Sequence, residues 1–194
     1  MSRSLPHVDA AVLARARRGD RQAHADLYAV FAPAVYTLAR RMLVSTSLAE
    51  DVLQETFVEV LRKIGAFRGD AEFGSWVKRI AVNKCLMQLR SGWSVRRGSM
   101  PDLETLPGPE RHDGSLQGLA LDAALAQLSD TARAVVWLHD VEGYTHREIG
   151  RLMHRTASFS KSQLARAHEH LRALLHERPS DEETEPCTRI RETC

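Results

Sequence analysis

Apolar side chains recur at intervals of three and four residues through most of this 194-residue chain, and this spacing constrains the fold more than any other feature. Such spacing places the apolar groups along one stripe of a helix, whereas a half-buried strand alternates at every second residue. No long segment alternates in that way. The sequence therefore predicts an all-α protein. The stripe is clearest in residues 21–44, at Leu27, Tyr28, Phe31, Val35, Leu38 and Met42.

Capping residues, glycine and proline divide the chain into successive predicted helices. Ser47 and Glu50 have the spacing of a capping box at the start of the third helix, and Thr145 and Glu148 have the same spacing further on. A turn at 154–157 precedes the last helix. The predicted helices cover residues 9–18, 21–44, 47–64, 75–90, 119–128, 131–141, 145–153 and about 158–177.

Residues 91–117 interrupt the helical pattern. Glycine, serine and proline are frequent there and periodic apolar residues are few, which is typical of a linker. We therefore expect two small helical domains, over residues 8–91 and 118–178, joined by a flexible linker over residues 92–117. An acidic tail over 179–194 is expected to be disordered.

The longest uncharged, largely apolar run covers residues 27–39, which is 13 residues, and it contains Pro33. A membrane-spanning helix needs about 20 residues, so no membrane insertion is expected. Residues 1–20 have no apolar core of a signal peptide, which indicates a cytoplasmic protein. The three cysteines are too few for a disulfide scaffold.

The net charge of +2 conceals separate charged segments. Residues 1–90 carry a net charge of +5, whereas residues 179–194 carry −3. Residues 146–178 contain 7 basic and 3 acidic side chains. Glu50, Asp51, Glu55 and Glu59 form an acidic run without an intervening base. Separate surfaces of this kind could bind a polyanion and a basic protein, although charged helical faces are often merely solvated.

The last two predicted helices have the pattern of a helix-turn-helix motif. In this motif the second helix enters the major groove of DNA, where Gln, Arg, Lys and Ser can bond to base edges. The start of the shorter helix, at Thr145 and His146, could meet a phosphate. An ordinary helical hairpin is the alternative. The candidate base-reading residues are Ser158, Phe159, Lys161, Ser162, Gln163 and Arg166.

The predicted helix 75–90 carries a second candidate DNA-binding surface. At about 100° per residue, Trp76, Arg79, Asn83 and Arg90 share one stripe. Aromatic planes among cations suit single-stranded DNA, because bases stack and phosphates are neutralised. The alternative is that the aromatic residues belong to the core. The flanking candidates are Lys78 and Lys84 on the helix, and Phe67, Arg68 and Phe73 just before it.

Residues 20–178 resemble the extracytoplasmic-function sigma factors of bacterial RNA polymerase. Residues 49–57 (AEDVLQETF) resemble the polymerase-binding helix of region two in that family. Residues 73–84 (FGSWVKRIAVNK), continuing to Arg90, resemble the segment that melts and reads the minus-ten element. Residues 125–128, 135–138 and 142–149 resemble region four, which reads the minus-thirty-five element.

The resemblance implies a role for each segment. The face made by Glu50, Asp51, Gln54 and Glu55 would dock on a coiled coil of the polymerase beta-prime clamp, and region four would meet the beta flap. Residues 67–70, including Asp70, would hold a flipped base with Asn83. Lys78, Arg79, Lys84 and Arg90 would contact the DNA backbone. Partners would be core RNA polymerase, promoter DNA and, as for many members, an anti-sigma factor.

The chain departs from the family pattern at a few positions. His154 stands where members usually have Gly, so the turn there is expected to be less tight or differently capped. Ser160 and Gln163 stand where Val and Arg are common, which bears on the exact minus-thirty-five sequence. Leu48 stands where Asp is common.

No catalytic motif is present, so an enzyme is not expected, and neither is a cofactor or a metal site. A zinc deaminase would need Pro-Cys-x-x-Cys, whereas Cys187 and Cys194 are seven positions apart. Two alternatives to a sigma factor remain. A helix-turn-helix regulator acting without core polymerase would not need the acidic helix or the Trp76 stripe. An inactive sigma-like decoy would not need the basic faces.

Overall fold

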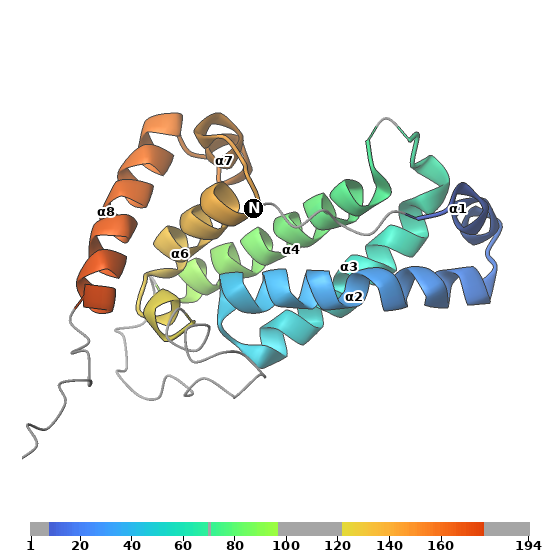
Figure 1. The fold of residues 1–194 in the computed structure, drawn as a ribbon, viewed down its shortest axis with the longest axis horizontal. Coiled ribbons are helices and arrows are strands. Elements are labelled where there is room, and N and C mark those ends of the chain that lie inside the picture. The colour runs from blue at the N-terminus through green and yellow to red at the C-terminus, as the bar shows by residue number, and fades with distance from the viewer. Residues whose placement is uncertain (1–7, 70, 97–121, 177–194) are drawn as a thin grey trace, which may run out of the picture.

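The computed structural model describes residues 8–69, 71–96 and 122–176, and every regular element in them is helical, as predicted (Figure 1). Most of the linker, the tail and Asp70 lie outside the described residues. No described helix has both the length and the apolar composition needed to cross a membrane. Residues 122–126 are helical as well. The named elements are α1 (Ala10–Arg17), α2 (Arg21–Leu43), α3 (Thr46–Lys63), a 3₁₀ turn η1 (Ile64–Ala66), α4 (Phe73–Arg96), α6 (Asp130–Val136), a π-helical turn η2 (Trp137–Val141), α7 (His146–Leu152) and α8 (Ala157–His176).

The first domain is a bundle in which α2, α3 and α4 pack on one another. Their apolar stripes meet in a core that includes Leu27, Phe31, Val52, Val77 and Leu86, all of which are buried. The predicted helix 75–90 is longer at both ends, since α4 runs from Phe73 to Arg96. The early end predicted from glycine and serine was wrong, because a single glycine is tolerated inside a helix.

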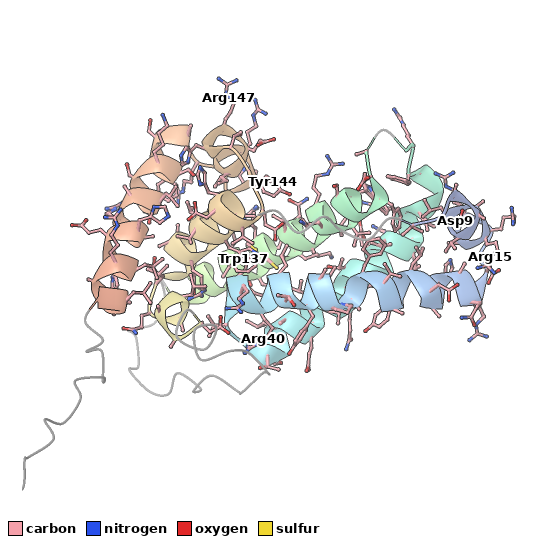
Figure 2. All side chains as sticks on the ribbon, viewed as in Figure 1. Asp9, Arg15, Arg40, Trp137, Tyr144 and Arg147 are labelled. Atoms are coloured by element: carbon pink, nitrogen blue, oxygen red, sulfur yellow. The ribbon has the colours of Figure 1, made fainter. Side chains whose placement is uncertain are left out.

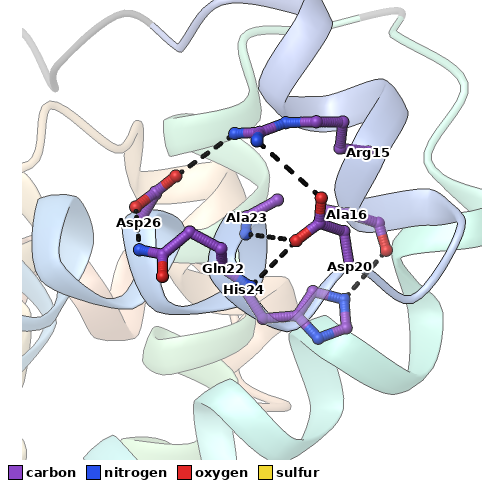
Figure 3. Close-up of polar contacts among 7 residues, drawn as sticks. All are labelled: Arg15, Ala16, Asp20, Gln22, Ala23, His24 and Asp26. Atoms are coloured by element: carbon purple, nitrogen blue, oxygen red, sulfur yellow. Dashed lines mark hydrogen bonds and ion pairs between the residues drawn. The ribbon is translucent and has the colours of Figure 1, made fainter.

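A polar joint fixes α1 against α2 (Figure 3). Asp20 is the N-cap of α2, and its carboxylate accepts from the backbone N–H groups of Gln22 at 2.9 Å and Ala23 at 3.1 Å. These hydrogen bonds, that from Ala23 above all, lower the pKa of Asp20. Arg15 of α1 reaches Asp26 of α2 at 3.3 Å. The joint holds the end of α1 close to the loop that precedes α4.

The predicted cap of the third helix was wrong by two residues. Ser45, not Ser47, is the N-cap of α3, and its hydroxyl accepts from the N–H of Leu48 at 3.3 Å. Helix α2 ends at Leu43, its C-cap Val44 has a φ of 64°, and the chain is extended at Ser45. An N-cap needs that extended backbone, so the tight turn decides which serine caps the helix.

The second domain contacts the first where α6 lies beside the end of α2 (Figure 1). Arg133 of α6 is 3% exposed, and its Nε donates to the carbonyl of Met42 at 3.1 Å. The same guanidinium donates to Leu128 and Asp130 in its own domain. Nearby, Arg41 pairs with Asp122 and lies over the Trp137 ring at 5.8 Å.

Candidate nucleic-acid interface

The acidic face predicted on α3 is exposed. Glu50, Asp51, Gln54 and Glu55 are all exposed to solvent, on a helix whose other side packs on α2 and α4. Glu55 also forms an ion pair with Lys84 of α4 at 3.1 Å. The acidic face and the basic side of α4 therefore adjoin in one domain.

An aromatic cluster joins the start of α4 to the preceding loop. Phe73 is only 6% exposed and lies 5.6 Å from Phe31, so its ring belongs to the core. Phe67 and Trp76 are partly buried, 5.3 Å apart, and each lies within 5.4 Å of Phe73. The alternative that the aromatic residues belong to the core is therefore correct for Phe73. Its ring packs against Phe67 and Trp76 and positions them. Phe67 and Trp76 are the rings with surface left for a ligand.

These two rings line a pocket with a volume of about 420 Å³. Arg68 and Arg79 also line it from the first domain, and Tyr144 and Glu148 line it from the second. Burial raises the pKa of Tyr144, which faces α4 (Figure 2). Aromatic faces beside guanidinium groups suit an unstacked base and its phosphate. Sequence reasoning named Tyr144 only within the region-four segment, because nothing local links it to Trp76.

The polar side chains of α4 that are predicted to contact DNA differ in their exposure and in their partners. Arg79 and Asn83 are exposed. Lys78 forms an ion pair with Glu142 at 2.6 Å, and Arg90 donates to the carbonyl of Leu152 at 2.9 Å. The Trp76 stripe therefore lies along α4 as predicted. Two of the side chains predicted to contact DNA, Lys78 and Arg90, bind residues of the second domain.

The capping box at the start of α7 is confirmed. The Thr145 hydroxyl accepts from the N–H of Glu148 at 3.3 Å, and the Glu148 carboxylate accepts from the Thr145 N–H at 2.8 Å. Hydrogen bonds from Thr145 lower the pKa of Glu148. Arg147, which sequence reasoning did not select, is exposed and points away from the molecule (Figure 2). The box fixes the first turn of the motif.

In the turn between α7 and α8, His154 adopts the left-handed backbone conformation. The family that the sequence resembles usually has glycine at this position. His154 has a φ of 53°, a region that non-glycine residues adopt uncommonly but in which histidine is enriched. The N–H of Arg155 donates to the carbonyl of Gly150 at 2.7 Å, so the turn is tight. Of the two expected alternatives, a less tight turn is not observed, because His154 adopts the left-handed conformation.

The predicted base-reading residues lie along one helix. Ser158, Lys161, Ser162 and Arg166 are exposed on α8, and Phe159 and Gln163 are partly buried. Arg155 lies over the Phe159 ring at 5.6 Å, a cation–π contact that sequence spacing did not single out. The exposed polar groups at the start of α8 are compatible with base contacts.

His146 is held by its own domain. Its Nδ1 lies 3.0 Å from the Ser160 hydroxyl, and its ring stacks on that of His139 at 4.5 Å. Burial lowers the pKa of His146, and the nearby His139 and Lys161 act in the same direction. Ser160 and His139 thus fix the position of the His146 ring within the second domain.

Replacing Gly150 by alanine is expected to destabilise the motif. The added Cβ would lie 2.8 Å from the carbonyl oxygen of Arg155, a backbone atom that cannot rotate away. Overpacking of this kind costs about 1–3 kcal/mol. Gly65→Ala is the control, because its Cβ would meet nothing within 4 Å. Urea unfolding of both variants checks this, and equal stabilities would contradict the close approach.

Taken together, these features define a helical DNA-binding protein of the helix-turn-helix class. Residues 27–95 match the family model for sigma-70 region 2, and residues 118–171 match that for sigma-70 region 4. The chain is 36% identical over 166 residues to RNA polymerase sigma factor CarQ of Myxococcus xanthus, covering 84% of this chain and 95% of that protein. The chain belongs to the extracytoplasmic-function group of RNA polymerase sigma factors.

A second relative agrees with this family, and two solved structures share the fold. The chain is 32% identical over 167 residues to the ECF sigma factor SigM of Mycobacterium tuberculosis, covering 86% of this chain and 84% of that one. Its fold is similar to that of RpoE from Bartonella quintana, solved with the anti-sigma factor NepR, with a TM-score of 0.58 and 23% identity over 78% of this chain and 96% of the other. The fold is also similar to that of CnrH, solved in complex with the cytosolic domain of CnrY, with a TM-score of 0.52 and 24% sequence identity. That similarity covers 86% of this chain and 96% of CnrH.

Proposed function

We propose that this sigma factor binds core RNA polymerase through the α3 face formed by Glu50, Asp51, Gln54 and Glu55. The observation that carries the proposal is that this exposed acidic face lies in the same domain as Phe67 and Trp76, the two aromatic rings that line the pocket. A protein that uses both would hold a base of the opened strand beside the polymerase clamp. Such an arrangement couples docking to duplex opening.

The pocket between Phe67 and Trp76 is proposed to take a base flipped from the non-template strand of the minus-ten element. Stacking on aromatic side chains contributes about 1–3 kcal/mol per base, which offsets part of the cost of unstacking it. Arg79 and Arg68 line the same pocket and are proposed to contact phosphates. Helix α8 is proposed to read the minus-thirty-five element, with Thr145 and His146 against the backbone.

The proposed role is non-catalytic, since the polymerase would supply the chemistry of RNA synthesis. We propose that the protein acts in the cytoplasm, beside the chromosome. Control by an anti-sigma factor is also proposed. Support for it comes from the fold shared with RpoE and CnrH, each solved with a partner of that kind or with the domain of one.

A promoter-opening assay distinguishes the proposed sigma-factor function from the alternative, a helix-turn-helix regulator that acts without core polymerase. The purified chain and core polymerase are mixed with fragmented genomic DNA, and unpaired thymines are detected with permanganate. We expect opening only when both proteins are present, at sites that share two spaced elements. Duplex binding by the chain without opening would favour the alternative.

Arg166→Ala is expected to weaken promoter binding by about 1–3 kcal/mol, or about 5- to 150-fold, if the guanidinium bonds to a base. Arg166 is exposed on α8, one turn beyond Ser162. Arg172→Ala is the matched control, because Arg172 is exposed on a different side of the same helix. Binding of the holoenzyme to an opened promoter is measured, and equal affinities for both variants would remove Arg166 from the interface.

A further inference from the structure

Helix α1 contacts the loop that carries one of the two pocket rings. Arg17, the last residue of α1, donates from Nη2 to the carbonyl oxygen of Phe67 at 2.5 Å, although the two residues are 50 positions apart. The same guanidinium lies over the Phe67 ring, with its Cζ 5.9 Å from the ring centroid. Hydrogen bonds from charged donors are stronger than neutral ones, and a cation within about 6 Å of a ring is attracted to its face. Arg17 therefore binds both the backbone and the side chain of Phe67.

The end of α1 is anchored, so the Arg17 side chain reaches the loop from a fixed backbone. Ala16 is 1% exposed, and its carbonyl oxygen lies 2.8 Å from Nε2 of His24 on α2 (Figure 3). Arg15 forms an ion pair with Asp26 of α2 at 3.3 Å. The contacts between α1 and α2 thus decide where the Arg17 guanidinium lies.

The loop itself begins where regular structure ends. The 3₁₀ turn η1 stops at Ala66, and the backbone is extended at Phe67. Gly69 has a φ of 86°, a conformation that favours glycine. Among the described residues, Arg17 provides the side-chain hydrogen bond to the backbone of this loop. The position of the Phe67 ring then depends on Arg17 and on the two rings that it contacts, Phe73 and Trp76.

Arg17 acts on the pocket from outside it. Phe67 lines the pocket, whereas Arg17 is not among the described residues that do so. A base stacked on Phe67 would therefore feel Arg17 through that ring and its backbone. A side chain that is already held in place loses less conformational freedom on binding, so the fixed ring lowers the cost of capturing a base.

We infer that Arg17 is a positioning residue for base capture, because it holds the Phe67 ring and its backbone in place before DNA arrives. This role depends on the proposed function of the pocket. It differs from that of Arg68 and Arg79, which line the pocket and are proposed to contact phosphates. Helix α1 lies outside residues 27–95, which match the family model for sigma-70 region 2.

The test measures the affinity of the holoenzyme for a labelled oligonucleotide by fluorescence anisotropy. The oligonucleotide is the non-template strand of the minus-ten element from a promoter found in the opening assay. Arg17→Ala should weaken binding by about fivefold, the effect of losing one exposed cation–π contact. Arg18→Ala is the matched control, because Arg18 is the next residue, is also exposed and makes no side-chain hydrogen bond or ion pair with the described residues. It should bind within about twofold of the parent.

A double-mutant cycle separates positioning from a direct phosphate contact. In Phe67→Ala there is no ring to hold, so adding Arg17→Ala should change the affinity by less than about twofold. If Arg17 bound a phosphate, its loss would instead add in full to that of Phe67→Ala.

An abasic strand gives a readout that a merely structural role would not move. Each base of the element is removed in turn, and the position that costs the parent the most affinity identifies the captured base. Arg17→Ala should bind the strand that lacks this base as tightly as the parent does. Urea unfolding and binding to core polymerase should match those of Arg18→Ala, which confirms that the variant is folded.

The outcomes distinguish this role from the proposed function. The inference is overturned if Phe67→Ala weakens binding while Arg17→Ala binds the intact strand as tightly as Arg18→Ala. It is also overturned if Arg17→Ala loses as much affinity for the abasic strand as for the intact one. The proposed pocket stands in both cases. If Phe67→Ala binds the intact strand as tightly as the parent, the proposed pocket is itself contradicted, and the role of Arg17 with it.

Discussion

Replacing Asp51 by lysine is expected to abolish binding of the chain to core RNA polymerase. Asp51 is exposed at the centre of the acidic face of α3, and the substitution turns attraction to a basic partner into repulsion. Truncating one partner of a charge pair that is buried at an interface costs about 2–5 kcal/mol, so the affinity should fall by about 30-fold or more. The fold should be unaffected, because the Asp51 side chain is exposed to solvent.

Binding of labelled chain to core polymerase, followed by fluorescence anisotropy without DNA, measures this effect. Glu169→Lys makes the same change of charge at an exposed position of α8. It should bind core polymerase within about threefold of the parent, a difference of less than 1 kcal/mol. A retained affinity in Asp51→Lys would show that polymerase docks elsewhere.

Arg133→Met is expected to lower the free energy of unfolding by about 3 kcal/mol. The guanidinium is buried and donates to two backbone carbonyls and to Asp130, and methionine fills part of the volume without replacing any donor. Because domains of this size are stable by about 5–15 kcal/mol, the loss is a large share of the total. The carbonyl of Met42 loses a partner that ties the two domains together.

Urea unfolding followed by circular dichroism gives the comparison. Arg172→Met makes the same chemical change at an exposed position, where substitutions usually stay within about 0.5 kcal/mol. A loss in Arg133→Met no larger than in Arg172→Met would mean that the buried hydrogen bonds contribute nothing net. Buried ionic groups can be replaced at little cost in some proteins, so the experiment is informative.

Local patterns were enough to predict that α2, α3 and α4 are helical and where the DNA-reading motif begins, but not both ends of α4 or the cap of α3. The stripe from Leu27 to Met42 gave the position of α2, and Thr145 with Glu148 gave the cap of α7. The cap of α3 was misplaced because Ser47 and Glu50 have the spacing of a capping box, whereas Ser45 has no such partner in the sequence. Only the backbone at Val44, with its φ of 64°, decides between them.

The parts that could not be predicted depend on contacts between distant residues. Arg133 and Met42 are 91 positions apart, and no periodicity links them. The same holds for Lys78 with Glu142 and for Tyr144 with Trp76, which belong to different domains. Sequence spacing therefore placed Arg90 on a DNA-binding stripe and Lys78 beside it, but could not show that the second domain contacts both side chains.

Single-round transcription from an opened promoter tests the central claim most directly. Core polymerase with the purified chain should yield a transcript from one start site downstream of the opened element, and core polymerase alone should not. Asp51→Lys should yield none at the same concentration. The assignment of the chain as the factor that directs polymerase to that promoter would be contradicted by one result. That result is an equal amount of transcript with and without the chain, in a mixture where the chain binds the promoter duplex.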